Sequence, residues 1–176
     1  MAEVYWAARD LASSPVGNHQ YIVINLNANE TLSGIPIQEE SGKRFVTLGG
    51  HVSGSLTNGN LIYIPNQRDD VIAVKESVNA SLRGFFSDFS LEKHPVIARG
   101  SSAWGFANQI KHLAERYAAN TKDNPVRYNL FNQNCSTWVN TIMKIAGVSE
   151  AERLRLGDFR GFDSGQTKLL DENLFR

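Results

Sequence analysis

The most informative segment lies in the second half of the chain and is Tyr128-Asn129-Leu130-Phe131-Asn132-Gln133-Asn134-Cys135-Ser136-Thr137-Trp138-Val139. Asparagine is a good helix N-cap, so Asn134 predicts a helix over residues 134–146 whose first turn holds Cys135. The unpaired amides and the positive end of the helix dipole favour an anion at this position. A thiol there loses its proton more easily, and the thiolate is the nucleophilic form. The same amides can face the oxyanion that forms when a carbonyl is attacked.

The segment directly before Cys135, residues 132–134, is unusually polar for a cysteine that only fills a core. We expect the backbone N–H of Cys135 to contribute to an oxyanion hole, with the side chain of Asn132 or Gln133, and we group Asn134 and Trp138 with them as oxyanion or substrate-binding residues. The alternative is that Cys135, alone on an apolar helix face, is a buried small hydrophobe. The domain would then be a non-catalytic binding module with a slowly reacting thiol.

A candidate base precedes the cysteine by more than half the chain. His19 opens the clearest strand, residues 19–26, after a break at Gly17-Asn18. This strand lacks clean alternation, which is typical of a central strand covered on both sides. An imidazole within hydrogen-bond reach of a thiol forms the reactive ion pair and later protonates the leaving group. The alternative for His19 is a histidine in a surface turn.

A third residue would hold the imidazole in the correct tautomer. If residues 19–26 and 43–51 form an antiparallel hairpin that pairs Leu26 with Arg44, the same register places His19 opposite His51. A slip of one residue would break this arrangement. We therefore predict His51 as the orienting residue, with rivals that share a polar side chain near either strand: Gln20, Asn25 and Asp10.

Length and composition indicate one ordinary globular domain over residues 1–176. Hydrophobic residues are 41% of the 176, and Lys plus Arg balance Asp plus Glu at 18 each, so the net charge is zero. No third of the chain is strongly basic, which argues against a nucleic-acid partner. The single cysteine excludes an internal disulfide and multi-cysteine zinc sites. Neither a signal peptide nor an apolar run of about 18 residues is recognisable, so we expect no stable membrane insertion.

The pattern of residues predicts an α+β fold with strands first and helices later. Further strands are expected near residues 4–11, 61–64 and 71–74, and a short helix can run from Glu76 to Phe86. Apolar residues at helical spacing predict a helix over 103–119, with Ser101 or Ser102 as N-cap. Residues 149–176 read as a C-terminal wrapping segment with a helical start. We expect a small antiparallel sheet packed against a central Cys135 helix whose N-terminus points at His19.

The order of these motifs resembles that of a known group of enzymes. His19-Gln20-Tyr21-Ile22-Val23 is similar to the histidine strand, and Asn134-Cys135-Ser136-Thr137-Trp138-Val139 to the cysteine helix, of the circularly permuted papain-like (NlpC/P60-like) hydrolases, which include lecithin:retinol acyltransferase-like proteins. In the permuted group the histidine precedes the cysteine, as it does here. A second histidine on the following strand, as at His51, is a feature of the acyltransferase-like branch, although the spacing from His19 is longer here.

The resemblance implies a cysteine hydrolase that cleaves an amide bond without a cofactor or metal, most readily in peptidoglycan peptides. It also implies the route of an antibacterial effector: synthesis in the cytoplasm, export by a specialised secretion machine to a target cell's periplasm, and a cognate immunity protein as partner. The alternative within the same chemistry is a thiol-dependent lipid acyltransferase or phospholipase. A membrane-facing apolar patch would distinguish the enzyme that acts on lipids from the one that cleaves peptides.

Overall fold

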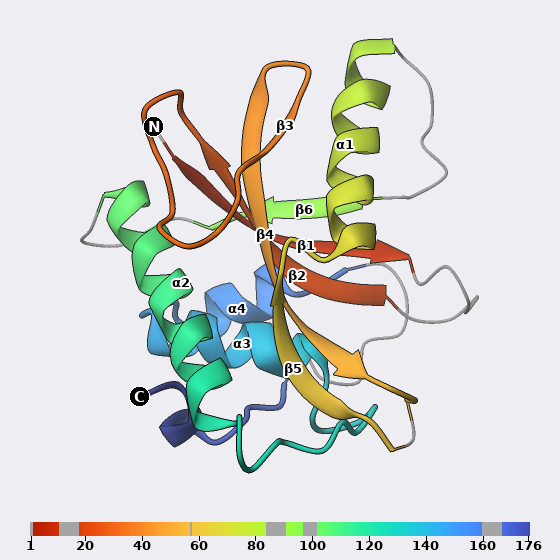
Figure 1. Cartoon of the computed structure of the whole chain (residues 1–176), viewed down its shortest axis with the longest axis vertical. Coiled ribbons are helices and arrows are strands. Elements are labelled where there is room, and N and C mark those ends of the chain that lie inside the picture. The colour runs from red at the N-terminus through yellow and green to blue at the C-terminus, as the bar shows by residue number, and fades with distance from the viewer. Residues whose placement is uncertain (1, 11–17, 57, 84–90, 97–101, 160–166) are drawn as a thin grey trace.

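The computed structural model describes residues 2–10, 18–56, 58–83, 91–96, 102–159 and 167–176. It is an α+β fold, as predicted (Figure 1). The strands are β1 (Glu3–Asp10), β2 (Asn18–Leu26), β3 (Gln38–Glu40), β4 (Lys43–Ser53), β5 (Asn60–Pro65) and β6 (Leu91–Pro95). The helices are α1 (Arg68–Arg83), α2 (Ala103–Asn120), α3 (Cys135–Ile145), α4 (Glu150–Leu156) and the short 3₁₀ helix η1 (Glu172–Phe175).

The strands form one antiparallel sheet in the order β3-β4-β2-β1-β6, and β5 pairs with the second half of β4. Strand β2 lies between β1 and β4, which confirms that it is a central strand. The β2–β4 register pairs Leu26 with Arg44 and Ile22 with Leu48, so the predicted register is confirmed. Extended by three residues beyond the Ile22–Leu48 pair, this register places His19 at the level of His51.

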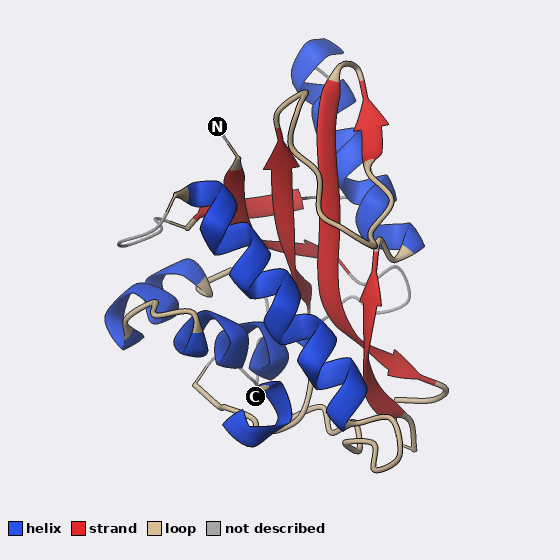
Figure 2. Cartoon of the chain, turned by 60° about the vertical axis from the view of Figure 1, so that its left-hand side comes forward, coloured by secondary structure: helices blue, strands red, loops and turns tan. Residues whose placement is uncertain are grey.

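The two faces of the sheet are covered by different helices (Figures 1 and 2). The larger core lies between the sheet and helices α2 and α3, and its largest fully buried side chains include Trp6, Ile22, Ile24, Leu48, Ile110, Tyr117 and Trp138. The smaller core lies under α1 and consists of Ala7, Tyr21, Val23, Phe45 and Val74. Because side chains alternate along a strand, residues such as His19 and His51 face α1.

The expected strand at 71–74 is wrong, because these residues belong to α1. Helix α1 also includes residues 76–83 of the helix expected over 76–86, and residues 84–86 lie outside the described residues. The β-branched side chains at 71–74 favour a strand locally. However, Val71 and Val74 are spaced as on one helix face, and both pack on the smaller core. Asp69 and Asp70 precede them in the first helical turn, where acidic side chains are favoured by the helix dipole. Tertiary packing therefore outweighs the local preference.

Helix α3 is packed tightly on the sheet at a glycine. A Cβ atom at Gly50 would lie 2.7 Å from Cγ of Trp138, closer than real Cβ contacts allow. Trp138 has no exposed surface and stacks on Tyr63 with 5.8 Å between ring centroids. Gly50 thus permits the close approach of strand and helix that sets the height of the α3 N-terminus over β4.

The end of the chain is held against α3 by buried polar groups. Asn140 donates to the carbonyl of Lys168 at 2.9 Å, and the Thr141 hydroxyl accepts from the amide of Leu170 at 2.9 Å. Residues 160–166 of the expected wrapping segment lie outside the described residues, as does Gly17. Of the two N-cap candidates for α2, Ser102 is the N-cap, and Ser101 lies outside the described residues. In the described part of the chain, no helix has the length and apolar character needed to cross a bilayer.

We predict that Gly50→Ala lowers the free energy of unfolding by about 1–3 kcal/mol, the usual cost of overpacking a core. The new methyl group must displace Trp138 or bend β4. Chemical denaturation monitored by tryptophan fluorescence measures the change. Glu39→Ala, an exposed substitution on β3, is the control and is expected to stay within about 0.5 kcal/mol of the parent.

Candidate active site

Two histidines from neighbouring strands lie side by side under α1. His19 near the start of β2 and His51 of β4 have ring centroids 4.4 Å apart, and both are buried. The His51 ring leans back over Gly49, because a Cβ atom there would lie 2.7 Å from His51 Nε2. Gly49 and Gly50 therefore leave room on opposite faces of β4, one for His51 and the other for Trp138.

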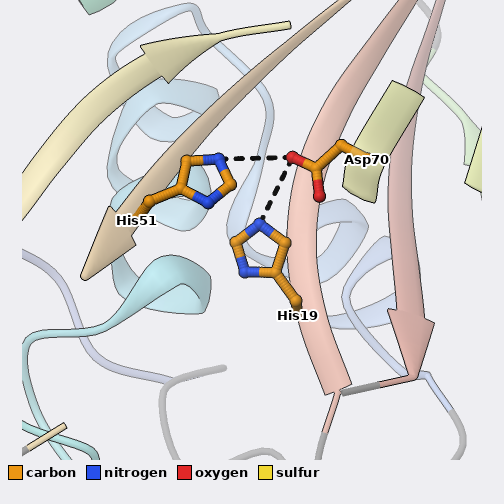
Figure 3. Close-up of side chains that lie close together, drawn as sticks. All are labelled: His19, His51 and Asp70. Atoms are coloured by element: carbon orange, nitrogen blue, oxygen red, sulfur yellow. Dashed lines mark ion pairs between the residues drawn. The ribbon is translucent and has the colours of Figure 1, made fainter. Parts of the chain in front are cut away.

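A carboxylate from α1 lies at the ring nitrogens of both histidines (Figure 3). Asp70 Oδ2 is 3.4 Å from His19 Nε2 and 3.2 Å from His51 Nε2, and Asp70 has no exposed surface. Gln67 caps this end of α1, since its side-chain oxygen accepts from the amides of Asp69 and Asp70. The start of α1 is thereby fixed with Asp70 directed at the sheet.

The other oxygen of the carboxylate is held by an arginine. Arg9 Nε donates to Asp70 Oδ1 at 2.7 Å, and only 5% of Arg9 is exposed. Arg9 is the cross-strand neighbour of His19 in the β1–β2 register. A buried carboxylate is costly unless it is paired and hydrogen-bonded, and Arg9 meets this requirement.

Cys135 is the first residue of α3, as predicted. Asn134 is the N-cap: its side chain accepts from the amide of Thr137, and the Thr137 hydroxyl accepts from the amide of Asn134. The thiol hydrogen-bonds to the His19 ring, and its charge acts on that ring. Since Nε2 of His19 faces Asp70, Nδ1 is the nitrogen left for the thiol.

The charges around the two imidazoles separate their proton affinities. Burial alone would lower the pKa of His19, but the charges of Asp70 and Cys135 raise it to about 9. Burial lowers the pKa of His51, and the positive charges of His19 and Arg9 lower it further against the opposing effect of Asp70. Burial would raise the pKa of Asp70, but its pairing with the imidazoles holds it well below the usual range. The site therefore keeps a proton on His19 and none on His51 at neutral pH.

The phenol of Tyr128 is affected by the charge of Cys135. Burial and the charge of Cys135 raise the pKa of Tyr128 well above its usual value, so its phenol stays protonated. Its backbone is fixed by a hydrogen bond from its amide to the carbonyl of Gly59 at 2.9 Å.

The remaining predicted residues do not all reach the site. Trp138 is fully buried in the core, so the structure contradicts its role in binding substrate. The side chain of Asn134 is used in capping and also donates to the carbonyl of Leu130. Asn132 is exposed and Gln133 is half-buried, on the loop directly before Cys135, so both remain candidates for the oxyanion.

The position expected for an orienting His51 is occupied by Asp70. His51 shares this carboxylate with His19 instead of holding the His19 ring itself. None of the three rivals takes the position in the described structure: Gln20 accepts from Trp6 on the opposite face of the sheet, Asn25 lies at the far end of β2, and Asp10 ends β1 opposite Asn18. Asp70 is not among the residues predicted for the site, because a strand over residues 71–74 would not place it there. The acidic pair at 69–70 was the available signal for a helix start.

The site also has the spacing of a metal site. One ligand-type atom from each of His19, His51 and Asp70 lies within 4.8 Å of the others. One feature opposes a cation there, because Arg9 already pairs with the Asp70 carboxylate at 2.7 Å. We therefore interpret the cluster as a proton-holding network.

Comparison of the chain with protein-family models finds no match, and neither a curated protein nor a solved structure matches it. The family expected from the sequence thus stays a prediction, and the argument about function depends on the geometry of the site.

We predict that Asp70→Asn lowers the pKa of His19 by at least about one unit from its value near 9, because an opposite charge at this distance shifts a pKa by about 1–3 units. NMR titration of the histidine ring carbons measures it. Asp69→Asn is the matched control, since the Asp69 side chain is half exposed and lies 4.0 Å from Arg9. An unchanged His19 titration in Asp70→Asn would contradict the assignment of Asp70.

Proposed function

We propose that the protein is a cysteine hydrolase that cleaves an amide bond, with Cys135 as nucleophile, His19 as general acid and base, and Asp70 as the residue that orients His19. The observation that carries the proposal is the contact between a helix-start thiol and an imidazole that is backed by a buried carboxylate. Nucleophile, base and orienting group in this order are the requirements of thiol catalysis.

The reaction follows from the positions of these groups. The Cys135 thiolate attacks the carbonyl carbon, and the oxyanion is stabilised by amides at the start of α3, with the Tyr128 hydroxyl as a further donor. His19 gives its proton to the leaving amine as the C–N bond breaks, which leaves a thioester on Cys135. A water molecule then attacks the thioester while His19 accepts its proton. The acid product leaves, and the thiolate–imidazolium pair is restored.

The arrangement supports the permuted papain-like interpretation. A histidine on a central strand precedes a cysteine helix that packs against the same antiparallel sheet. On this interpretation we propose peptidoglycan peptides as the substrate. The proposal includes export by a secretion machine and a cognate immunity protein, which depend on the resemblance alone.

The opposing interpretation, a binding module without catalysis, has one feature in its favour: only 7% of Cys135 is exposed. It requires an unreactive thiol, however, whereas the contact with His19 favours a reactive one. The rate of alkylation distinguishes the two interpretations, because a buried structural cysteine reacts only when the protein unfolds.

We predict that native Cys135 is alkylated by iodoacetamide at pH 6, well below the free-cysteine value of about 8.5, and that His19→Ala removes this reactivity. Cys135→Ala is expected to abolish release of peptides from purified peptidoglycan, measured by mass spectrometry. His112→Ala, which removes an exposed histidine of α2, is the control. Alkylation only after unfolding would support the binding module instead.

The proton on His19 determines the direction in which the rate of hydrolysis changes with pH. Below about 9 His19 holds the proton that the leaving amine needs, and above it this proton is lost. Hydrolysis by the parent protein is therefore expected to fall as the pH rises through about 9. General acid catalysis contributes about 10²–10⁴-fold, which sets the size of the fall.

A second candidate function, acyl transfer or hydrolysis on a lipid, is favoured by an apolar loop beside the nucleophile. Leu130 and Phe131 are 45% and 59% exposed, on a turn closed by two hydrogen bonds between Asn129 and Gln133. The turn adjoins the β4–β5 hairpin, where Leu56 is 57% exposed (Figure 1). Burying a side chain such as Phe131 in a lipid surface would contribute about 1.5–3 kcal/mol.

If the substrate is a lipid, Phe131→Ser should weaken binding to phosphatidylcholine vesicles about tenfold or more, because the exposed ring supplies part of the adsorption energy. Vesicle co-sedimentation measures binding. Trp104→Ser is the matched control, since Trp104 is also exposed but lies at the start of α2. Absence of vesicle binding in the parent protein would exclude this function and leave the peptide substrate.

A further inference from the structure

A small cavity lies outside the candidate active site, where α3 and α4 pack side by side (Figure 1). Its volume is about 200 Å³, and its polar lining includes Asn140 and Lys144 of α3 and Arg153 of α4. Along α3, Asn140 and Lys144 lie about 8 and 14 Å beyond Cys135, at about 1.5 Å per residue. The cavity is therefore a separate candidate site.

Arg153 lines this cavity as a buried cation, with only 8% of the residue exposed. Its Nε donates to Asn140 Oδ1 at 2.9 Å, and its Nη1 donates to the carbonyl of Val148 at 2.6 Å. Both acceptors are neutral, and none of the ion pairs between described residues includes Arg153. Because an arginine is rarely buried so deeply unless it is paired, this cation calls for an anion.

The guanidinium of Arg153 has donors left for such an anion. A guanidinium carries five N–H groups, and the two hydrogen bonds use one on Nε and one on Nη1. The parallel N–H groups of an arginine match the two oxygens of a carboxylate, which makes this the strongest neutral-pH partner for the group. The geometry of the side chain therefore favours a carboxylate in the cavity.

The acidic residues nearby are used elsewhere or exposed. Glu172 pairs with Lys144 at 2.7 Å and with Arg176 at 3.1 Å. Glu150 lines the cavity, but it is exposed, so solvent screens its charge. Burial lowers the pKa of Arg153 against the opposing charges of Glu150 and Glu172. A direct contact with Arg153 is thus left for a ligand.

Two leucines give the cavity an apolar part. Leu154 of α4 and Leu169, near the end of the chain, line it and are 40% and 38% exposed. The volume is smaller than the range of about 300–1,000 Å³ that holds whole small-molecule ligands. The cavity therefore suits one residue-sized group that has a carboxylate at one end and an apolar side chain at the other.

We propose that this cavity is a binding site for a carboxylate that bears a short apolar group, with the carboxylate on Arg153 and the apolar group against Leu154 and Leu169. The C-terminal residue of a peptide has this chemistry, and so does a short branched fatty acid. The site does not depend on the thiol chemistry at Cys135. Its failure and the failure of the proposed hydrolase are therefore seen in different experiments.

The test is a titration of the ¹⁵N-labelled protein with N-acetyl-L-leucine, followed by NMR at the amides of α4 and of residues 167–170. We expect a dissociation constant in the millimolar range, which is typical of a ligand of this size. N-acetyl-L-leucinamide, which lacks the charge, and acetate, which lacks the apolar group, should bind at least about tenfold more weakly, since each loses one of the two contacts. Isovalerate distinguishes the sources: equal affinity indicates a free acid, and weaker binding indicates a peptide C-terminus.

Three variants locate the ligand. Arg153→Gln should weaken binding of N-acetyl-L-leucine at least about tenfold, because hydrogen bonds to charged groups are the stronger ones. Arg155→Gln, the same change at an exposed residue of α4, is the matched control and should leave binding unchanged. Glu150→Gln should tighten binding roughly two- to fivefold, because it removes a like charge from the lining.

Equal binding of N-acetyl-L-leucine and its amide would overturn the proposal, as would equal affinities of Arg153→Gln and Arg155→Gln. Amide shifts confined to other parts of the protein would also overturn it. Thermal unfolding establishes that each variant is folded. If Arg153→Gln does not fold, the exposed Glu150→Gln carries the test, and binding that does not tighten in this variant would overturn the proposal.

Discussion

The Asp70 carboxylate is a full negative charge without any contact with solvent, and its burial constrains the elements around it. A charge in this position is tolerated only if it is paired on both oxygens. Arg9 from β1 pairs with one oxygen, and His19 from β2 and His51 from β4 approach the other. These contacts fix the position of helix α1 on the sheet, with Asp70 paired to side chains from three strands. Val71 and Val74 pack on the smaller core in the same position.

Helix α3, which begins at the proposed nucleophile Cys135, packs on the other face of the sheet, and β4 contacts helices on both faces. Gly49 accommodates His51 toward α1, while Gly50 accommodates Trp138 toward α3. Adjacent glycines of β4 thus allow both close approaches: Gly50 that of α3, which bears Cys135 at its N-terminus, and Gly49 that of the His51 ring. A site assembled from both faces depends on such close approaches, because a shift of about an ångström in a catalytic group is costly.

The electrostatic arrangement gives the site its chemical character. A helix N-terminus favours the thiolate, and Asp70 together with the thiolate favours the imidazolium of His19. Arg9 pairs with the other carboxylate oxygen and offsets the charge of Asp70. The two proposed substrate classes, a lipid and a peptide, require the same assembly, and the exposed Leu130 and Phe131 lie outside it.

Local sequence patterns were sufficient for the central strand at His19, the helix that begins at Cys135 and the β2–β4 register, because capping, β-propensity and alternation act between near neighbours. They were insufficient for α1, where Val71 to Val74 favour a strand and the packing on the smaller core imposes a helix. Asp70 and Arg9 lie 61 residues apart, and their pairing exists only when that helix docks. The identity of the orienting carboxylate, the sharing of it by two histidines and the burial of Trp138 were decided by tertiary structure, since each depends on contacts between elements distant in the chain.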